Sequence, residues 1–126
     1  MTTARYVLLE HTWRGVHWDL MFEDAARGVL RTWRLATRPD DGLDVEARKL
    51  PDHRLVYLDY EGPVAGDRGF VRRVDAGAFA MVAESESEFR ARLKGGQLAG
   101  LIALRRTDSG PDSSGWTCLF RRGKRD

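Results

Sequence analysis

Two histidines and an aspartate stand close together near the N-terminus, in the stretch EHTWRGVHWDLMFED. His11 and His17 are six residues apart, and Asp19 follows two positions after His17. In an extended strand from Val16 to Phe22 the side chains alternate, so His17 and Asp19 would share one face and could converge on one ion. A hairpin through the turn TWRG would bring His11 beside them. Two imidazoles and one carboxylate suit manganese, zinc or iron and leave positions open for water and substrate.

A second pair of side chains with chemical potential lies in DHRLVYLDYEG. His53 and Tyr57 would share a face if a strand begins near His53, placing an imidazole and a phenol along one edge of a site. Simpler interpretations exist for both stretches, because HxD recurs by chance on polar strand faces and a strand tyrosine is more often a core or interface residue. His17, Asp19 and His53 could also form the facial triad of a non-haem iron oxygenase, although that set leaves His11 without a role.

Short strands separated by turn signals are predicted for most of the chain. Only SESEFRARLKGG indicates a helix, near residues 86–94, because Ser85 and Glu88 have capping-box spacing and Gly95 could end it. The segments Thr37–Asp52 and Thr107–Gly115 are predicted to be polar loops. The fold class is therefore mainly β, a compact antiparallel barrel of about eight strands with one short helix. The predicted strands are Arg5–His11, Val16–Phe22, Val29–Leu35, Arg54–Tyr60, Gly69–Val74, Phe79–Ala83, Leu98–Leu104 and Trp116–Arg121.

Length and composition favour one globular domain over residues 1–126, with a basic tail at 122–126: the chain has 126 residues, 42% of them hydrophobic. The pI is near 9.0, and only three of the 21 basic residues, Lys49, Lys94 and Lys124, are lysines. Because the arginine side chain suits phosphate recognition, this composition is consistent with a nucleic-acid partner. With one cysteine, Cys118, no intramolecular disulfide can form, and the absence of a signal-peptide pattern or a long apolar run leads us to expect a cytoplasmic protein without a membrane partner.

The segments HTWRGVHWDLMFED, GVLRTW, DHRLVYLDYEG and GQLAGLIALRR follow one another in an order that resembles the 3′-phosphoesterase domain of bacterial DNA ligase D. The resemblance runs from Arg5 to about Arg122. It implies a β-barrel that trims DNA 3′ ends in non-homologous end joining, removing a terminal ribonucleoside and then the 3′-phosphate with a manganese ion. It further implies metal ligation by His11, His17 and Asp19, a phosphate contact from His53 and a catalytic role for Tyr57.

The chain departs from the family pattern where the family has a phosphate-binding arginine, because Met21 occupies that position and cannot donate a hydrogen bond. Other family positions appear in this chain as Thr37, Val45 and Pro51. The resemblance therefore implies either a weakened phosphoesterase or a DNA-end-binding module that works with a separate DNA ligase or polymerase. Arginines expected to supply the missing charge are Arg14, Arg38, Arg48 and Arg54, and Trp13 and Trp33 could stack on an unpaired 3′ base, although core packing is the commoner fate.

Overall fold

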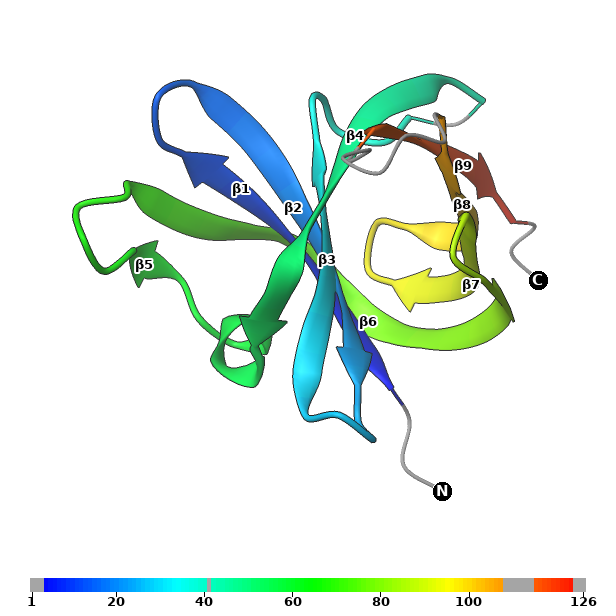
Figure 1. Ribbon diagram of the computed structural model, residues 1–126, viewed down its shortest axis with the longest axis horizontal. Coiled ribbons are helices and arrows are strands. Elements are labelled where there is room, and N and C mark those ends of the chain that lie inside the picture. Colours follow the sequence, from blue (N-terminus) through cyan, green and yellow to red (C-terminus); the bar gives the residue numbers. More distant parts are fainter. Residues whose placement is uncertain (1–3, 41, 108–114, 124–126) are drawn as a thin grey trace.

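Nine antiparallel β-strands account for most of residues 4–40, 42–107 and 115–123, the parts of the chain that the computed structural model describes (Figure 1). Eight of the strands close into a ring in the order β1-β2-β3-β4-β9-β8-β7-β6, because β6 pairs with β1 as well as with β7. The predicted barrel of about eight strands is thus confirmed. The strands are β1 (Arg5–Thr12), β2 (Val16–Asp24), β3 (Val29–Leu35), β4 (Asp44–Arg54), β5 (Gly62–Pro63), β6 (Phe70–Glu84), β7 (Glu88–Gly95), β8 (Ala99–Arg106) and β9 (Gly115–Arg122).

The barrel interior is filled by alternate residues of the strands, as period-2 patterning requires. Phe22, Trp33 and Phe89 form its aromatic centre, with the rings of Phe22 and Phe89 4.5 Å apart between centroids. Trp33 is fully buried there, so it packs in the core and is not placed to stack on a base. At one end, the Tyr6 hydroxyl donates a hydrogen bond to the Asp75 carboxylate over 2.7 Å.

A second apolar cluster lies on the outer face of β1, β2 and β3. It contains Leu9, Met21 and Leu30, and Leu58 packs onto it from η1, a one-turn 3₁₀ helix at Leu55–Leu58. The segment from η1 through β5 to β6 thus covers part of the barrel wall (Figure 1). Side chains beside this cluster lie partly out of water on a rigid sheet, which is a suitable place for a chemical site.

The helix predicted near residues 86–94 is wrong, because this segment is strand β7. Phe89, Ala91 and Leu93 are buried in the barrel and the residues between them are not, so the period of 2 decides the structure. The capping-box spacing belongs instead to the β6–β7 hairpin turn, in which the Ser85 amide donates to the Glu88 carbonyl. Gly95 lies in the next turn, where its amide donates to the Leu98 carbonyl.

Three other element boundaries differ from the predictions. The strand predicted at Arg54–Tyr60 is wrong, since β4 ends at Arg54 and η1 follows. Much of the predicted loop Thr37–Asp52 belongs to β4, where Val45 and Ala47 point inward between polar neighbours. The two strands predicted within residues 69–83 are one strand, β6.

Around Gly77 that long strand changes its pairing from β1 to β7, and a Cβ atom on Gly77 would lie 2.3 Å from the Lys94 carbonyl oxygen. The C-terminal end of the chain also differs slightly from expectation. Arg121 and Arg122 still belong to β9, while most of the predicted loop Thr107–Gly115 and the end of the expected tail lie outside the described residues.

In the described part of the chain, no helix has the length and apolar character needed to cross a membrane.

Candidate metal centre and the cavity beside it

The β1–β2 hairpin brings His11, His17 and Asp19 together, as the sequence predicts. His11 and His17 are direct partners in the strand register, and Asp19 follows on the same face of β2. One ligand atom from each residue can be chosen so that all three lie within 4.8 Å of one another. His17 Nε2 is 3.0 Å from His11 Nδ1, and His11 Nδ1 is 3.5 Å from Asp19 Oδ2. Three possible ligand atoms therefore face a common point.

The imidazole of His11 is oriented by a backbone contact on its other side. Its Nε2 lies 2.8 Å from the Arg68 carbonyl oxygen, and a carbonyl accepts a proton only from an N–H. In neutral His11 this leaves the Nδ1 lone pair directed at Asp19 and His17. Such a hydrogen bond from the remote ring nitrogen is the usual support of a metal-ligating histidine.

A glycine allows the Arg68 carbonyl to come this close. Gly69 has φ +81, and a Cβ atom at this position would lie 1.9 Å from the Thr12 carbonyl oxygen. Only glycine tolerates both the backbone angle and the close approach of β1. The turn that precedes β6 is thereby held against the end of β1, next to His11.

Asp19 is almost completely buried and is held by a charged neighbour that the sequence analysis missed. The Arg34 Nε donates to Asp19 Oδ1 over 3.0 Å, because Arg34 is the register partner of Asp19 on β3. Burial alone would raise the pKa of Asp19, but the contacts with His11 and Arg34 outweigh it and hold that pKa below its usual range. The carboxylate is thus charged, and its Oδ2 remains directed toward His11.

The two histidines differ in their electrostatic surroundings. The contact with Asp19 raises the pKa of His11 despite its burial, whereas burial and the nearby Arg34 lower the pKa of His17. The surroundings of His11 therefore stabilise a positive charge on its imidazole. The surroundings of His17 favour its neutral form, which can offer a nitrogen lone pair to a metal ion.

The donor set fits a divalent metal ion. Two imidazole nitrogens and one carboxylate oxygen face one another, and a backbone carbonyl fixes the tautomer of His11. Arg34 binds the second carboxylate oxygen of Asp19, and its Nη2 lies 3.4 Å from His11 Nδ1. Manganese, zinc and iron all accept such ligands, so the set itself does not select among them.

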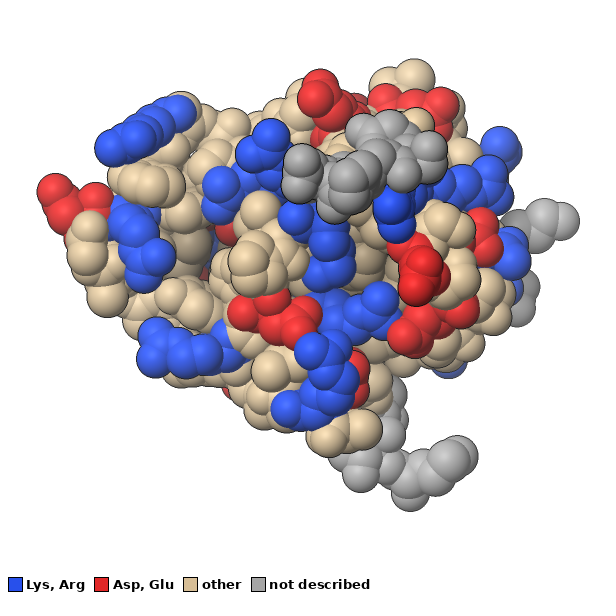
Figure 2. All heavy atoms as spheres, in the orientation of Figure 1, with Lys and Arg blue, Asp and Glu red and all other residues tan. Residues whose placement is uncertain are grey.

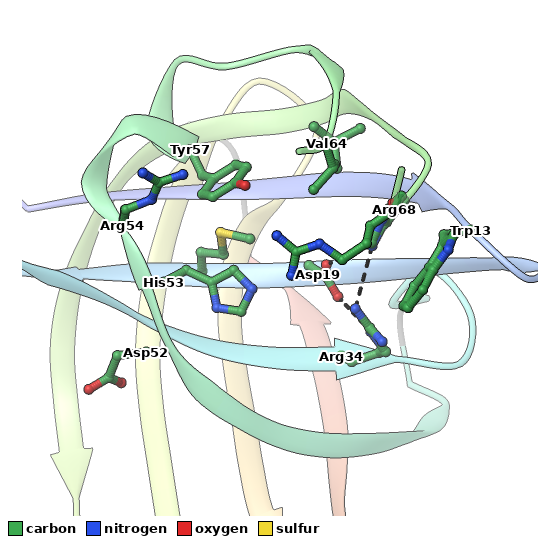
Figure 3. A pocket seen from close by; sticks show the side chains of 12 residues that line it. Trp13, Asp19, Arg34, Asp52, His53, Arg54, Tyr57, Val64 and Arg68 are labelled. Carbon is green, nitrogen blue, oxygen red and sulfur yellow. Dashed lines mark hydrogen bonds and ion pairs between the residues drawn. The ribbon is translucent and has the colours of Figure 1, made fainter. Parts of the chain in front are cut away.

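A cavity of about 270 Å³ opens beside this cluster and contains the second pair of residues from the sequence analysis. His53 and Tyr57 line it with ring centroids 5.9 Å apart, although one is in β4 and the other in η1, so they do not share the predicted strand. Figure 3 shows Asp19, Arg34 and Arg68 between this pair and Trp13. The His53 Nδ1 lies 2.9 Å from the Pro51 carbonyl oxygen, which accepts its proton and leaves Nε2 for other contacts. His17 does not line the cavity directly.

Of the four arginines proposed from the sequence, one lines this cavity, namely Arg54. Arg14 packs over the Trp13 ring, and Arg38 donates to the side chain of Gln97 beside another cavity. Arg48 is the β4 partner of Arg34 but is outside the cavity lining.

The sequence analysis missed Arg34 and Arg68, the arginines nearest the cluster. Alternation within VLRTWRL does place Arg34 opposite Trp33 and therefore on the outer face, which was a usable signal. Arg68 is in a loop far from His11 in sequence, and no local pattern could have indicated their contact. Met21, the position at which the chain departs from the family pattern, lines the cavity and is fully buried among apolar side chains.

Basic and acidic side chains are interspersed on the face of the molecule shown in Figure 2, where no single basic patch covers the surface. Positive charge at the cavity comes from Arg34, Arg54 and Arg68, which line it. Comparison with known proteins adds no identification, since neither a known family nor a curated protein matches the chain.

Proposed function

We propose that this protein is a metal-dependent phosphoesterase that processes the 3′ ends of DNA, removing a terminal ribonucleoside or a 3′-phosphate in end joining. One observation carries the proposal. The cluster of His11, His17 and Asp19 lies beside the same cavity as His53 and Tyr57, although more than 30 residues separate the two groups in sequence. The ordered sequence resemblance to the phosphoesterase domain of DNA ligase D supports the same function.

Each group has a defined role in this proposal. A divalent ion, with manganese preferred, would supply a Lewis acid for a phosphate oxygen. His53 Nε2 is available to stabilise charge on the phosphoryl group or to protonate the leaving oxygen, and Tyr57 orients the phosphate. The Arg54 and Arg68 side chains lie at the cavity and attract the DNA backbone, so binding is expected to be sensitive to salt and largely independent of base sequence.

Arg34 is the candidate that compensates for Met21. A buried methionine in an apolar cluster offers no donor to phosphate, whereas Arg34 brings a guanidinium group into the same cavity from the neighbouring strand. Its Nε is engaged with Asp19, and its terminal nitrogens remain close to the cluster, with Nη2 3.4 Å from His11 Nδ1. A guanidinium with one edge on a carboxylate retains donors for an anion.

A DNA-end-binding module remains the second candidate, and the burial of Met21 favours it. Such a module would use the same cavity to bind a 3′ end and would leave chemistry to a separate ligase or polymerase. An oxygenase is less well supported, because His53 does not join His17 and Asp19 in any ligand cluster among the described residues. A cytoplasmic location is part of the phosphoesterase proposal.

The test uses a 5′-labelled primer-template that ends in a 3′-ribonucleotide or a 3′-phosphate, incubated with Mn²⁺ and resolved on a sequencing gel. Wild type is expected to shorten or dephosphorylate the primer, His11→Ala to be inactive, and Arg34→Ala to be slower by at least tenfold, since loss of one charged donor to a transition state usually costs about 10²-fold or more. If wild type binds the end without turnover and Met21→Arg gains activity, the binding-module interpretation replaces the proposal.

A further inference from the structure

A second hollow lies directly beside the proposed catalytic cavity, on the outer side of η1. It has a volume of about 480 Å³, within the usual range for small-molecule sites. The two share Arg54, Tyr57 and Val64 as lining residues, so one opens next to the other. The rest of its lining is Val56, Tyr60, Pro63 and Ala65.

The hollow is apolar and aromatic, with a single cationic side chain at the shared edge. Among the described residues, Arg54 is the only charged one that lines it. The rings of His53, Tyr57 and Tyr60 form a continuous series from the catalytic cavity into the hollow, with 5.9 Å between centroids at each step. A ligand that crosses from one to the other would meet the arginines of the catalytic cavity first and the aromatic residues of the hollow next.

Exposed apolar residues support a binding role for this surface. Val56 is 55% exposed and Leu55 38%, both on the single turn of η1. The same turn buries Leu58 against the barrel, so packing of the fold explains Leu58 but not the outward position of Val56. Val56 continues the apolar lining of the hollow, and a contiguous apolar surface of this kind marks ligand-binding grooves more often than a single exposed side chain does.

We infer that this hollow binds the base of the terminal nucleotide, unstacked from its neighbour, while the phosphate of that nucleotide occupies the catalytic cavity. The inference rests on the proposed function and names the part of the substrate that the site recognises. A nucleotide joins an anionic phosphate to a flat aromatic base through one sugar, which matches the order of groups from Arg34 through Tyr57 to Tyr60. Every base has a π face, so recognition would be tolerant of sequence.

The test compares two 5′-fluorescein oligonucleotides with identical 3′-phosphorothioate ends, one of which lacks the terminal base. Fluorescence anisotropy in Mn²⁺ gives both Kd values, and a gel assay with ordinary 3′-phosphate versions gives turnover. Stacking of one base is expected to strengthen binding about tenfold or more. Val56→Asp is expected to abolish that difference, because it places a charge in the hollow without affecting the core.

Val82→Asp is the matched control, since Val82 is 47% exposed on β6 and does not line the hollow. Equal binding of the two oligonucleotides by wild type would overturn the inference. It would also be overturned if the effect of the base survives Val56→Asp but disappears in Trp13→Ala, which would locate the base at the other end of the catalytic cavity. A base effect that depends on Val56 without any turnover would support the hollow and refute the proposed chemistry, so the two failures can be distinguished.

Discussion

Replacement of His17 by alanine is the sharpest test of the metal cluster. His17 is half-buried at the start of β2, and a side-chain hydrogen bond joins its Nε2 to His11 Nδ1. Without metal, His17→Ala should therefore change the free energy of unfolding by only about 1 kcal/mol or less. With metal, the variant would lack one of the three proposed ligands.

The size of the effect follows from mass action. At a Mn²⁺ concentration of about 100 times the wild-type Kd, binding to the folded state stabilises it by about 2.7 kcal/mol. For a chain of 126 residues, that corresponds to a rise in Tm of roughly 8–13 °C. Loss of even a residue that supports a metal ligand usually weakens binding by about 10- to 100-fold. At the upper value, the same Mn²⁺ concentration would stabilise His17→Ala by only about 0.4 kcal/mol.

The assay is thermal unfolding of wild type, His17→Ala and His53→Ala with Mn²⁺ and with chelator. His53→Ala is the matched control, because it removes the chain's remaining histidine, which is outside the cluster. Wild type and His53→Ala are expected to gain stability from the metal, and His17→Ala to gain almost none. An equal metal-dependent rise in Tm for all three proteins would refute the ligand assignment.

Three further predictions concern the fold and the support of the site. Burial raises the pKa of the Cys118 thiol to about 12, so only about 10⁻⁴ of the thiol is ionised at pH 8. Ellman's reagent should therefore label Cys118 only after the protein unfolds. Rapid labelling of the folded protein would contradict the inward direction of Cys118 on β9. Tyr6→Phe removes a hydrogen bond to Asp75, which also accepts from the backbone amides of Gln97 and Leu98, and should lower the free energy of unfolding in urea by about 1–3 kcal/mol; an unchanged midpoint would show that this hydrogen bond contributes nothing. Gly69→Ala should weaken Mn²⁺ binding by about 10- to 100-fold in a calorimetric titration, because it displaces the Arg68 carbonyl from His11. The control is Gly66→Ala, which has a similar φ of +79 but a nearest contact of 3.5 Å and should bind Mn²⁺ as wild type does. Equal Mn²⁺ affinities of the two variants would show that the Arg68 carbonyl does not support His11.

Sequence periodicity predicted the barrel and the face of β2 that carries the cluster. Alternation in VHWDLMF is unambiguous, since Leu20 and Phe22 point into the barrel while Asp19 and Met21 lie on its outer face. Residues 86–94 were misread as a helix, because the four-residue spacing of Phe89 and Leu93 fits both a helix and a strand. Only the pairing of β7 with β6 and β8 decides between them, and pairing is a tertiary property.

The cluster of two histidines and an aspartate was predictable from the sequence, and its surroundings were not. His11, His17 and Asp19 are joined by one hairpin, so local geometry was sufficient to bring them together. The approach of His53 and Tyr57 depends on the turn from β4 into η1, where burial of Leu58 prevails over the alternating pattern of the sequence. The contact of Arg68 with His11 depends on ring closure between β1 and β6, which no local pattern specifies.

The most direct test of a metal centre that acts on phosphate is pulsed electron paramagnetic resonance of Mn²⁺ bound to the protein, with and without an oligonucleotide that ends in a 3′-phosphorothioate. The account predicts nitrogen couplings from two imidazoles and, after the oligonucleotide is added, a phosphorus coupling, with the nitrogen couplings reduced in His17→Ala. Mn²⁺ that shows only water ligands in the wild-type protein would contradict it.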